Sequence, residues 1–443
     1  MFERRIFKRL LEWKDSPYRK PLVLRGARQV GKTTVIKQLS AYYDQTIYLN
    51  LETKADQAIF TNRASIREVV DALFFIKERR QDNGKTLIFM DEIQGSPEAI
   101  DSLRYFYEEY PQYHVVAAGS LLEAVFDTKI KFPVGRVDYR VLHPFSFEEF
   151  LWAMGEVQAT EQYNKVPIAS FAHEKLLQLF HLYALVGGMP EAVMRYMETH
   201  DLVAVRPVYE SLLQGYIDDV EKYARNSSQA QVIRYAITSC FREAGARIKF
   251  QGFGASTYNS REMGEALRTL QKARLLELVY PTTQISLPYS PDMKKSPRLQ
   301  VLDTGLLNFF AGVQKDVFAS RDLTNVYQGR IIEHITGQEL TSNNDEMFRN
   351  LLFWVRDKEG TTSEMDYLFI RDGVAFPVEV KSGKSGKLRS LHQYAEMARP
   401  ELAVRLYAGH FQIDHLKTPS GHSFRLVNLP YYLAGKLKDY IGL

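Results

Sequence analysis

The stretch Gly26-Ala27-Arg28-Gln29-Val30-Gly31-Lys32-Thr33 has the pattern G-x-x-x-x-G-K-T, which is typical of a phosphate-binding loop. A short apolar run at 21–25 precedes it and predicts a strand, and residues 34–39 follow with helical spacing. The motif is meaningful only between a strand and a helix, and that is its setting here. The sequence therefore predicts a nucleotide-binding loop, with a chance glycine-rich turn as the alternative.

The residue types in this loop suit phosphate chemistry. Glycines let the backbone curl so that successive N–H groups point at phosphate oxygens, and the helix adds its positive N-terminal end. We expect Lys32 to reach the outer phosphates and the Thr33 hydroxyl to ligate Mg²⁺. ATP and Mg²⁺ are thus the expected cofactors. The expected nucleotide-binding residues are Gly26, Ala27, Arg28, Gln29, Val30, Gly31, Lys32, Thr33 and Thr34.

Composition sets limits on the rest of the chain. Its 443 residues are enough for about two to four domains. The net charge of +4 is too small to indicate a nucleic-acid partner by itself. Cys240 is the only cysteine, which excludes an internal disulfide and a cysteine zinc cluster. We see no signal peptide and no run of ~20 apolar residues, so we expect a cytoplasmic protein without a membrane partner.

Strand-like and helical segments alternate over the first 142 residues. The strand-like runs lie at 21–25, 46–51, 86–90, 114–118 and 137–142. The helical segments lie at 31–43, 66–80 and 97–110, after a lead-in helix within 1–20 whose apolar stripe is Ile6, Leu10, Leu11 and Trp13. Alternation at this spacing predicts a parallel sheet with helices on both faces.

Two acids follow the third strand-like run. We expect Asp91 to hold Mg²⁺ through water and Glu92 to orient or deprotonate the attacking water. Two carboxylates are needed because the metal occupies one of them. Asp91 lies 59 residues after Lys32, a separation that fits an ATPase core. The alternative is a pair of solvated acids at a strand end.

Further candidates lie at the ends of the last two core strands. Ser120 follows the run at 114–118 and is a candidate sensor of the γ-phosphate, or else a helix N-cap. Arg136 and Arg140 flank the fifth run, where an arginine can neutralise charge in the transition state. Surface ion pairs are the alternative for each arginine.

The middle of the chain changes character twice. Residues 144–250 are mostly helical, with one break at 187–190, which fits a helical lid. A helix at 260–270 and strands at 275–280 and 298–302 then give the outline of a winged helix. In a DNA-binding interpretation this helix enters the major groove and Lys294 and Lys295 contact phosphates. Because the helix has no basic excess, packing or protein contacts are the alternative.

A third constellation lies near the C-terminus. Asp366 and Glu379 fall on two strand-like runs at 364–370 and 375–380, joined by a hairpin, and Lys381 is two positions after Glu379. Positions i and i+2 on a strand share a face. If the strands pair, two carboxylates and one ammonium meet, as metal-dependent phosphodiester hydrolysis requires. Glu333 on the preceding helix is a further candidate ligand, and a charged cross-strand pairing without metal is the alternative.

With these residues in view, the chain resembles an AAA+-type ATPase family of bacteria and archaea that carries a C-terminal domain of unknown function. The resemblance rests on RGARQVGKT at 25–33, MDEIQ at 90–94 and the stretches 118–120, 144–149, 303–305 and 377–383. It implies ATP binding by the core, followed by a winged helix and a restriction-endonuclease-like fold. Asp366, Glu379 and Lys381 match the nuclease triad, whereas a Q-x-x-x-Y motif is absent because Met397 stands four positions after Gln393.

We therefore expect an α/β protein: a P-loop parallel-sheet ATPase core (1–143), a helical lid (144–205), a helical and winged-helix domain (206–325) and a restriction-endonuclease-like α/β domain (326–443). The leading hypothesis is an ATPase whose ATP cycle is coupled to DNA binding or processing. Two alternatives stay open. One is a nucleotide-driven switch whose inactive nuclease fold is an interaction module, and the other is a DNA-binding regulator that uses only the winged helix. Related ATPases often form rings, so a homo-oligomer is a further partner to consider.

Overall fold

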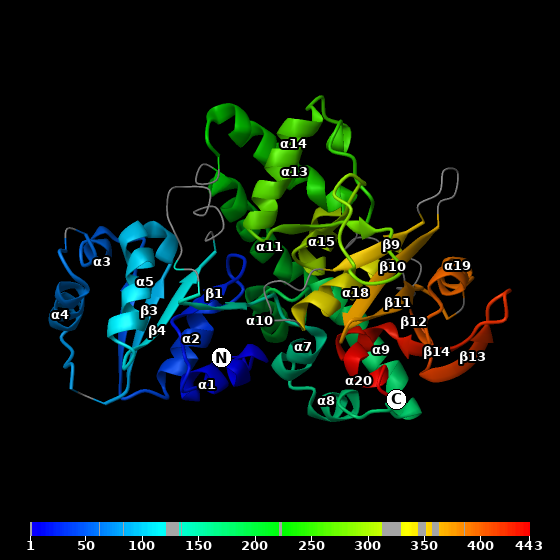
Figure 1. Cartoon of the computed structure of the whole chain (residues 1–443), viewed down its shortest axis with the longest axis horizontal. Helices are drawn as coiled ribbons and strands as arrows, with labels where there is room; N and C mark the ends of the chain where they lie inside the picture. Colours follow the sequence, from blue (N-terminus) through cyan, green and yellow to red (C-terminus); the bar gives the residue numbers. More distant parts are fainter. Residues whose placement is uncertain are drawn as a thin grey trace. The chain divides into compact units, whose positions relative to one another are not determined.

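The chain folds into two compact units, which a computed structural model describes (Figure 1). The described residues are 2–61, 63–82, 84–120, 133, 135–220, 224–311, 329–343, 351–356, 363–384 and 386–443. The first unit contains residues 1–143, and the second contains most of 144–443. The four predicted domain ranges remain predictions, and the boundary at 325 lies outside the described residues.

A five-stranded sheet forms the centre of the first unit. Its strands are β1 (Leu22–Arg25), β2 (Gln45–Asn50), β3 (Thr86–Asp91), β4 (His114–Gly119) and β5 (Asp138–Val141). All neighbours pair in parallel in the order β2-β3-β4-β1-β5, which confirms the predicted parallel sheet. Because parallel strands end at the same edge, the segments that follow β1, β3 and β4 meet there.

Helices cover both faces of this sheet (Figure 1). They are α1 (Ile6–Asp15), α2 (Lys32–Ser40), α3 (Lys54–Gln57), α4 (Ile66–Ile76) and α5 (Pro97–Glu109). The apolar residues of α4 and α5 form one core cluster with alternate residues of β1 to β4. On the other side, α2 contacts β3 and β4, and α1 packs on α2 with Ile6, Leu10 and Trp13 buried. The predicted lead-in helix is therefore part of this core.

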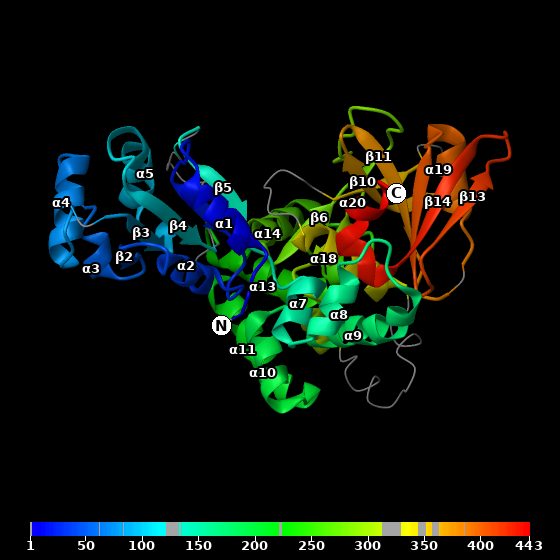
Figure 2. The same cartoon turned by 90° about the horizontal axis from the view of Figure 1, so that it is seen from below.

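Helices dominate the first part of the second unit, where α7, α8 and α9 lie side by side (Figures 1 and 2). The helices are α7 (Phe147–Ala153), α8 (Val157–Tyr163), α9 (His173–Val186), α10 (Pro190–Thr199), α11 (Leu202–Asp218), α13 (Ser227–Glu243), α14 (Ser260–Lys272) and α15 (Thr304–Ala311). Among the described residues, no single helix has the length and hydropathy needed to cross a membrane. Two consecutive helical segments, 170–186 and 190–199, reach that length and hydropathy only when taken together, and the chain bends by 116° between them.

The helix α14 is followed by a two-stranded antiparallel pair, β6 (Leu276–Val279) with β8 (Arg298–Val301). These are the helix and the two strands that the sequence predicts here. A short third strand, β7 (Pro281–Thr282), leaves this pair and joins β9 of the large sheet in parallel. The winged-helix assignment itself stays a prediction.

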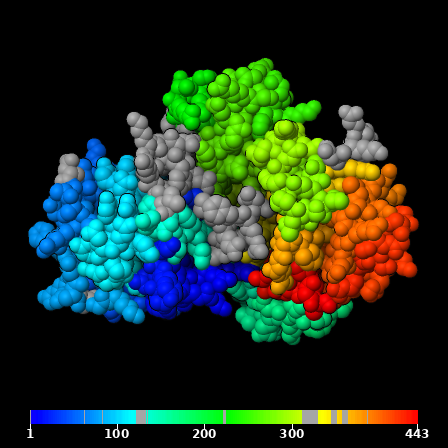
Figure 3. All heavy atoms as spheres, in the orientation of Figure 1, coloured from blue at the N-terminus to red at the C-terminus, as the bar shows by residue number. Residues whose placement is uncertain are grey.

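A seven-stranded mixed sheet completes the second unit, with the order β13-β14-β12-β11-β10-β9-β7. Its other strands are β9 (Leu352–Val355), β10 (Glu364–Arg371), β11 (Val374–Val380), β12 (Leu402–Tyr407), β13 (Gln412–Lys417) and β14 (Ser423–Pro430). The helix α19 (Arg389–Ala398) packs its apolar residues on this sheet, and α18 (Arg330–Ser342) contacts β11. The strands β12 and β14 contact η4 (Tyr431–Lys436), and their surface is continuous in the space-filling view, from orange to red (Figure 3).

A buried carboxylate, Asp303, fixes the turn between α9 and α10. Its Oδ2 accepts the N–H of Gly188 at 2.6 Å and its Oδ1 accepts the N–H of Leu306 at 3.0 Å. Gly187 has a φ of 76°, and a Cβ there would lie 2.3 Å from Asp303 Oδ1, so only glycine fits. The turn and the start of α15 thus depend on one side chain.

We predict that Asp303→Ala destabilises the second unit by about 2 to 4 kcal/mol, because it leaves two buried N–H groups without acceptors. Denaturant unfolding followed by circular dichroism measures this change. Asp439→Ala, at an exposed position of the same unit, is the matched control. Equal midpoints for the two variants would contradict the role of Asp303.

Candidate functional site

The predicted phosphate-binding loop joins β1 to α2 at the carboxyl edge of the sheet. Gly31 precedes α2 with a φ of 97°, and a Cβ on Gly26 would lie 2.4 Å from the carbonyl oxygen of Leu142. Both positions therefore require glycine. Lys32 is buried, and its Nζ donates to the carbonyl oxygens of Gly26 at 3.0 Å and Ala27 at 2.8 Å. The loop curls around the ammonium group of its own lysine.

Arg4 anchors this loop from outside the motif. Its Nη1 donates to the carbonyl oxygen of Val30 at 2.8 Å, and its Nη2 donates to that of His143 at 2.7 Å. Arg4 is buried, so it fixes the loop to the segment after β5. Sequence reasoning missed this residue. Nothing in a basic N-terminal segment distinguishes Arg4 from its neighbours Arg5 and Lys8.

Asp91 and Thr33 meet beside the loop. The Thr33 hydroxyl donates to Asp91 Oδ2 at 2.7 Å, and the Tyr48 hydroxyl donates to the same oxygen at 3.3 Å. Burial raises the pKa of Asp91 above its usual value, while the Thr33 hydrogen bond opposes that shift. A hydroxyl and a carboxylate side by side form an all-oxygen donor set, which is what Mg²⁺ prefers. These two residues therefore fit the predicted metal site.

Glu92, the candidate base, has an unusual backbone conformation. Its φ of 50° and ψ of 46° lie in the left-handed region, which is costly for a residue other than glycine. Gln94 donates its Nε2–H to Glu92 Oε2 at 2.6 Å and so orients the carboxylate. The turn presents Glu92 at the end of β3, next to Asp91. Sequence reasoning singled out Glu92 but not the residue that positions it.

The remaining core candidates have different surroundings. Ser120 directly follows β4, which lies between β3 and β1, so it stands at the same edge as Asp91 and the loop. Its alternative as an N-cap involves residues 121–132, which lie outside the described residues. Arg136 forms an ion pair with Glu108 at 3.1 Å, and Arg140 Nη1 donates to the carbonyl oxygen of Tyr139 at 2.9 Å.

The C-terminal constellation comes together on β10 and β11. These strands pair antiparallel with Tyr367 opposite Val378, which makes Asp366 and Glu379 the next facing positions. Asp366 Oδ2 accepts the N–H of Val380 at 2.7 Å, and Lys381 Nζ forms an ion pair with Glu379 Oε1. The other oxygen, Glu379 Oε2, is buried and has no hydrogen-bond partner among the described residues. This orphaned oxygen, in an all-oxygen donor set, fits a divalent cation.

The carboxylates of this constellation are electrostatically costly. Burial, and then the Asp366 charge, raises the pKa of Glu379 to about 7, and the same two causes raise the pKa of Glu333 to about 7. Burial also raises the pKa of Asp366. Burial is the largest cause of each shift, so these carboxylates are poorly solvated. A strongly perturbed carboxylate cluster beside a lysine marks a functional-site candidate.

The proposed DNA-reading helix presents little positive charge. On α14, Arg261 pairs with Glu265 at 3.3 Å, and the Arg268 guanidinium lies 5.9 Å from the centre of the Phe250 ring. Lys294 and Lys295 lie in the loop before β8, where the backbone N–H of Lys294 donates to Asp292 Oδ1 at 3.0 Å. Arg261 and Arg268 therefore both have contacts within the protein.

Three family models match successive parts of the chain. Residues 18–151 match a model described as an AAA domain, and residues 177–317 and 328–432 match two domains of unknown function, DUF8612 and DUF4143. Among solved structures, the Walker-type ATPase PABY2304 of Pyrococcus abyssi is similar at 16% identity, with a TM-score of 0.46. That match covers 70% of this chain and 96% of the other. A search among curated proteins gave no match.

The first unit is thus an AAA-type ATPase domain, since the family match covers the parallel sheet, the loop at 26–33 and the acids after β3. The two later matches are to families of unknown function and cover residues 177–317 and 328–432. Neither of those matches tests the winged-helix or nuclease-like assignments.

The buried ammonium of Lys32 makes ATP binding dependent on pH. Burial lowers its pKa to about 8 in the nucleotide-free loop. Bound phosphates favour the charged form, so binding raises this pKa. When binding raises the pKa of a group, the charged form of that group strengthens binding at a pH below the pKa of the free protein. This contribution is lost as the pH rises above that pKa. We therefore predict that ATP affinity falls as the pH rises through 8 and that binding takes up protons there.

Titration calorimetry at about pH 8.5 in two buffers of different ionisation enthalpy measures this proton uptake. The apparent binding enthalpies should differ between the buffers for the wild type. In Lys32→Met any residual binding should show equal enthalpies. Buffer-independent heats for the wild type would contradict the prediction.

Proposed function

We propose that the first unit binds ATP with Mg²⁺ and hydrolyses it. The observation that carries this proposal is the contact of Thr33 with Asp91 beside the buried Lys32, at the edge where the phosphate-binding loop meets the end of β3. Lys32 and the loop N–H groups bind the phosphates. Thr33 and Asp91 would hold the metal, which when bound would neutralise charge on the phosphate oxygens.

Glu92 acts as the base in this proposal. It lies next to the metal-holding Asp91, and its turn and Gln94 orient its carboxylate. There it accepts a proton from the attacking water. Ser120 lies at the same edge and binds the γ-phosphate as a sensor.

We predict that Glu92→Gln lowers kcat for ATP hydrolysis by at least about 100-fold and leaves ATP binding within a few-fold, because the amide cannot accept the proton. Phosphate release and fluorescent-nucleotide binding measure the two quantities. Glu109→Gln, at an exposed position on α5, is the matched control and should behave as wild type. Hydrolysis at the wild-type rate in Glu92→Gln would reject Glu92 as the base.

For the second unit we propose metal-dependent hydrolysis of a phosphodiester, with DNA as the substrate, coupled to the ATP cycle of the first. The specific support is the orphaned Oε2 of Glu379, a residue opposite Asp366 in the strand register, with Lys381 paired to its other oxygen. Asp366 and Glu379 would hold the metal, which when bound would lower the pKa of a water nucleophile. Lys381 stabilises charge on the scissile phosphate.

The rival function is a nucleotide-driven switch in which the same domain only binds a partner. The modest net charge and the engaged arginines of α14 favour it over a DNA-reading winged helix. The two functions differ in one measurable property, which is cleavage.

We predict that the wild type cleaves single-stranded, duplex or branched DNA in the presence of Mn²⁺, and that Glu379→Gln reduces cleavage to the level without metal, because a metal ligand is lost. Gel assays with and without ATP measure this. Glu401→Gln, exposed in the same unit, is the control. A wild type that cleaves none of these substrates with any divalent metal would favour the switch.

A further inference from the structure

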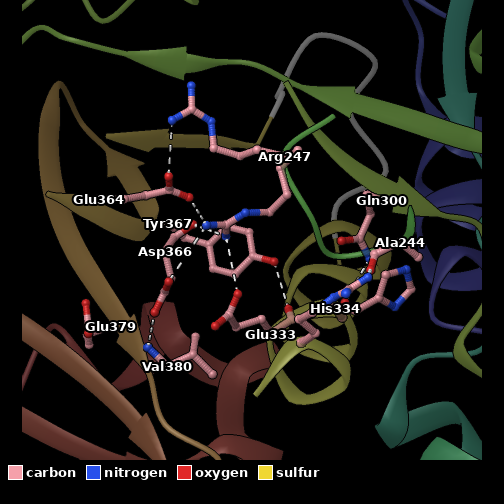
Figure 4. Close-up of polar contacts among 12 residues, drawn as sticks. Ala244, Arg247, Gln300, Glu333, His334, Glu364, Asp366, Tyr367, Glu379 and Val380 are labelled. Carbon is pink, nitrogen blue, oxygen red and sulfur yellow. Dashed lines mark hydrogen bonds and ion pairs between the residues drawn. The ribbon is translucent and has the colours of Figure 1, made fainter. Parts of the chain in front are cut away.

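One arginine of the middle region reaches into the carboxylate cluster of the C-terminal domain. Arg298, on β8, is only 5% exposed. Its Nη2 forms an ion pair with Glu364 and lies 3.8 Å from Asp366 Oδ1, and its Nη1 lies 3.9 Å from Glu333 Oε2. Nη1 also donates to the carbonyl oxygen of Asp366 at 3.0 Å. Each of the three carboxylates thus forms an ion pair with this one guanidinium group, and Figure 4 labels the three acids.

The guanidinium is fixed in place. Its carbon lies 4.8 Å from the centre of the Phe353 ring and 5.7 Å from that of Tyr367. The Tyr367 hydroxyl in turn donates to the carbonyl oxygen of Glu333 at 2.7 Å. The guanidinium group of an arginine keeps its positive charge in proteins. Arg298 is therefore a permanent, immobile cation within the cluster.

The formal charges of the cluster do not balance. Glu333, Glu364, Asp366 and Glu379 carry four negative charges, and Arg298 and Lys381 carry two positive ones. Arg247 also contacts Glu364, at 3.5 Å, so the formal sum with all three basic groups is −4 + 3 = −1. The cluster therefore keeps a net negative charge, which a bound cation can neutralise. Without Arg298 it would carry −2, and a position surrounded by three carboxylates would be left without its cation.

We propose that the cluster has two cation positions and that Arg298 fills one of them. The position between Glu333, Glu364 and Asp366 belongs to the guanidinium, and the position between Asp366 and Glu379 takes a divalent cation. Arg298 is thus a positioning residue that limits the site to a single ion. This inference rests on the metal site proposed above, but it concerns the number of ions and not cleavage.

The test counts Mn²⁺ bound to the nucleotide-free full chain, by electron paramagnetic resonance of the free ion. Arg298→Gln should bind one more Mn²⁺ per chain than the wild type, because an amide cannot fill the position with charge. Arg298→Lys keeps a positive charge and should bind as many ions as the wild type. Equal numbers for Arg298→Gln and the wild type, with both chains folded, would overturn the proposal, as would a gain in Arg298→Lys.

A second measurement keeps the proposal testable if Arg298→Gln does not fold. In the otherwise unchanged chain, Glu333→Gln should weaken Mn²⁺ binding by less than about five-fold, because Glu333 faces the guanidinium and acts on the ion only at a distance. Glu379→Gln should abolish binding at this site. A loss in Glu333→Gln as large as in Glu379→Gln would make Glu333 a ligand of the ion and would overturn the assignment of that position to Arg298.

The two proposals fail in different ways. The difference between Arg298→Gln and the wild type tests the role of Arg298, whatever the wild type binds. The number of ions bound by the wild type tests the metal site of the proposed nuclease. A wild type that binds no ion at the cluster, with a variant that gains one, would retain the Arg298 inference and reject metal-dependent cleavage by the wild type.

Discussion

The cost of burying charge shapes both candidate sites. A buried ion must be compensated by groups of opposite polarity, or its pKa shifts until it is neutral. In the first unit, the Lys32 ammonium donates to two carbonyl oxygens, and burial lowers its pKa. In the second unit, the carboxylates around Arg298 exceed their counter-charges, and the pKa values of Glu333 and Glu379 rise. The Lys32 site therefore lacks negative counter-charge, whereas the carboxylate cluster lacks positive counter-charge.

Topology brings each set of groups together. Parallel strands place the loop after β1, the acids after β3 and Ser120 after β4 at one edge, although these residues are far apart in the chain. The antiparallel pairing of β10 and β11 places Asp366 opposite Glu379 by its register alone. The third component of the second site, Arg298, comes from the two-stranded pair that precedes the large sheet. The middle region therefore contributes Arg298 to the C-terminal site, although the predicted domain boundary at 325 lies between Arg298 and the rest of that site.

The sequence is informative where the chemistry is local. Hydrophobic alternation predicts all five core strands, and short motifs predict the positions of Lys32, Thr33, Asp91 and Glu92. Each of these signals spans fewer residues than one strand and its helix. Arg298 and Arg4 could not be found in this way. The hydrogen-bond partners of Arg298 are 66 and 68 residues away along the sequence. Those of Arg4 are 26 and 139 residues away. The strands β12 to β14 were also missed. Two of them pair in parallel with partners across intervening segments, and β13 is an exposed edge strand without a clear apolar face.

The opposite polarities of the two sites bear on how one chain could use both. A loop with a buried ammonium group gains most from a polyanion. A cluster with excess carboxylates gains most from a cation, which must be bound before a phosphodiester can approach without repulsion. The nucleotide is a polyanion, so it cannot supply the positive charge that the carboxylate cluster lacks.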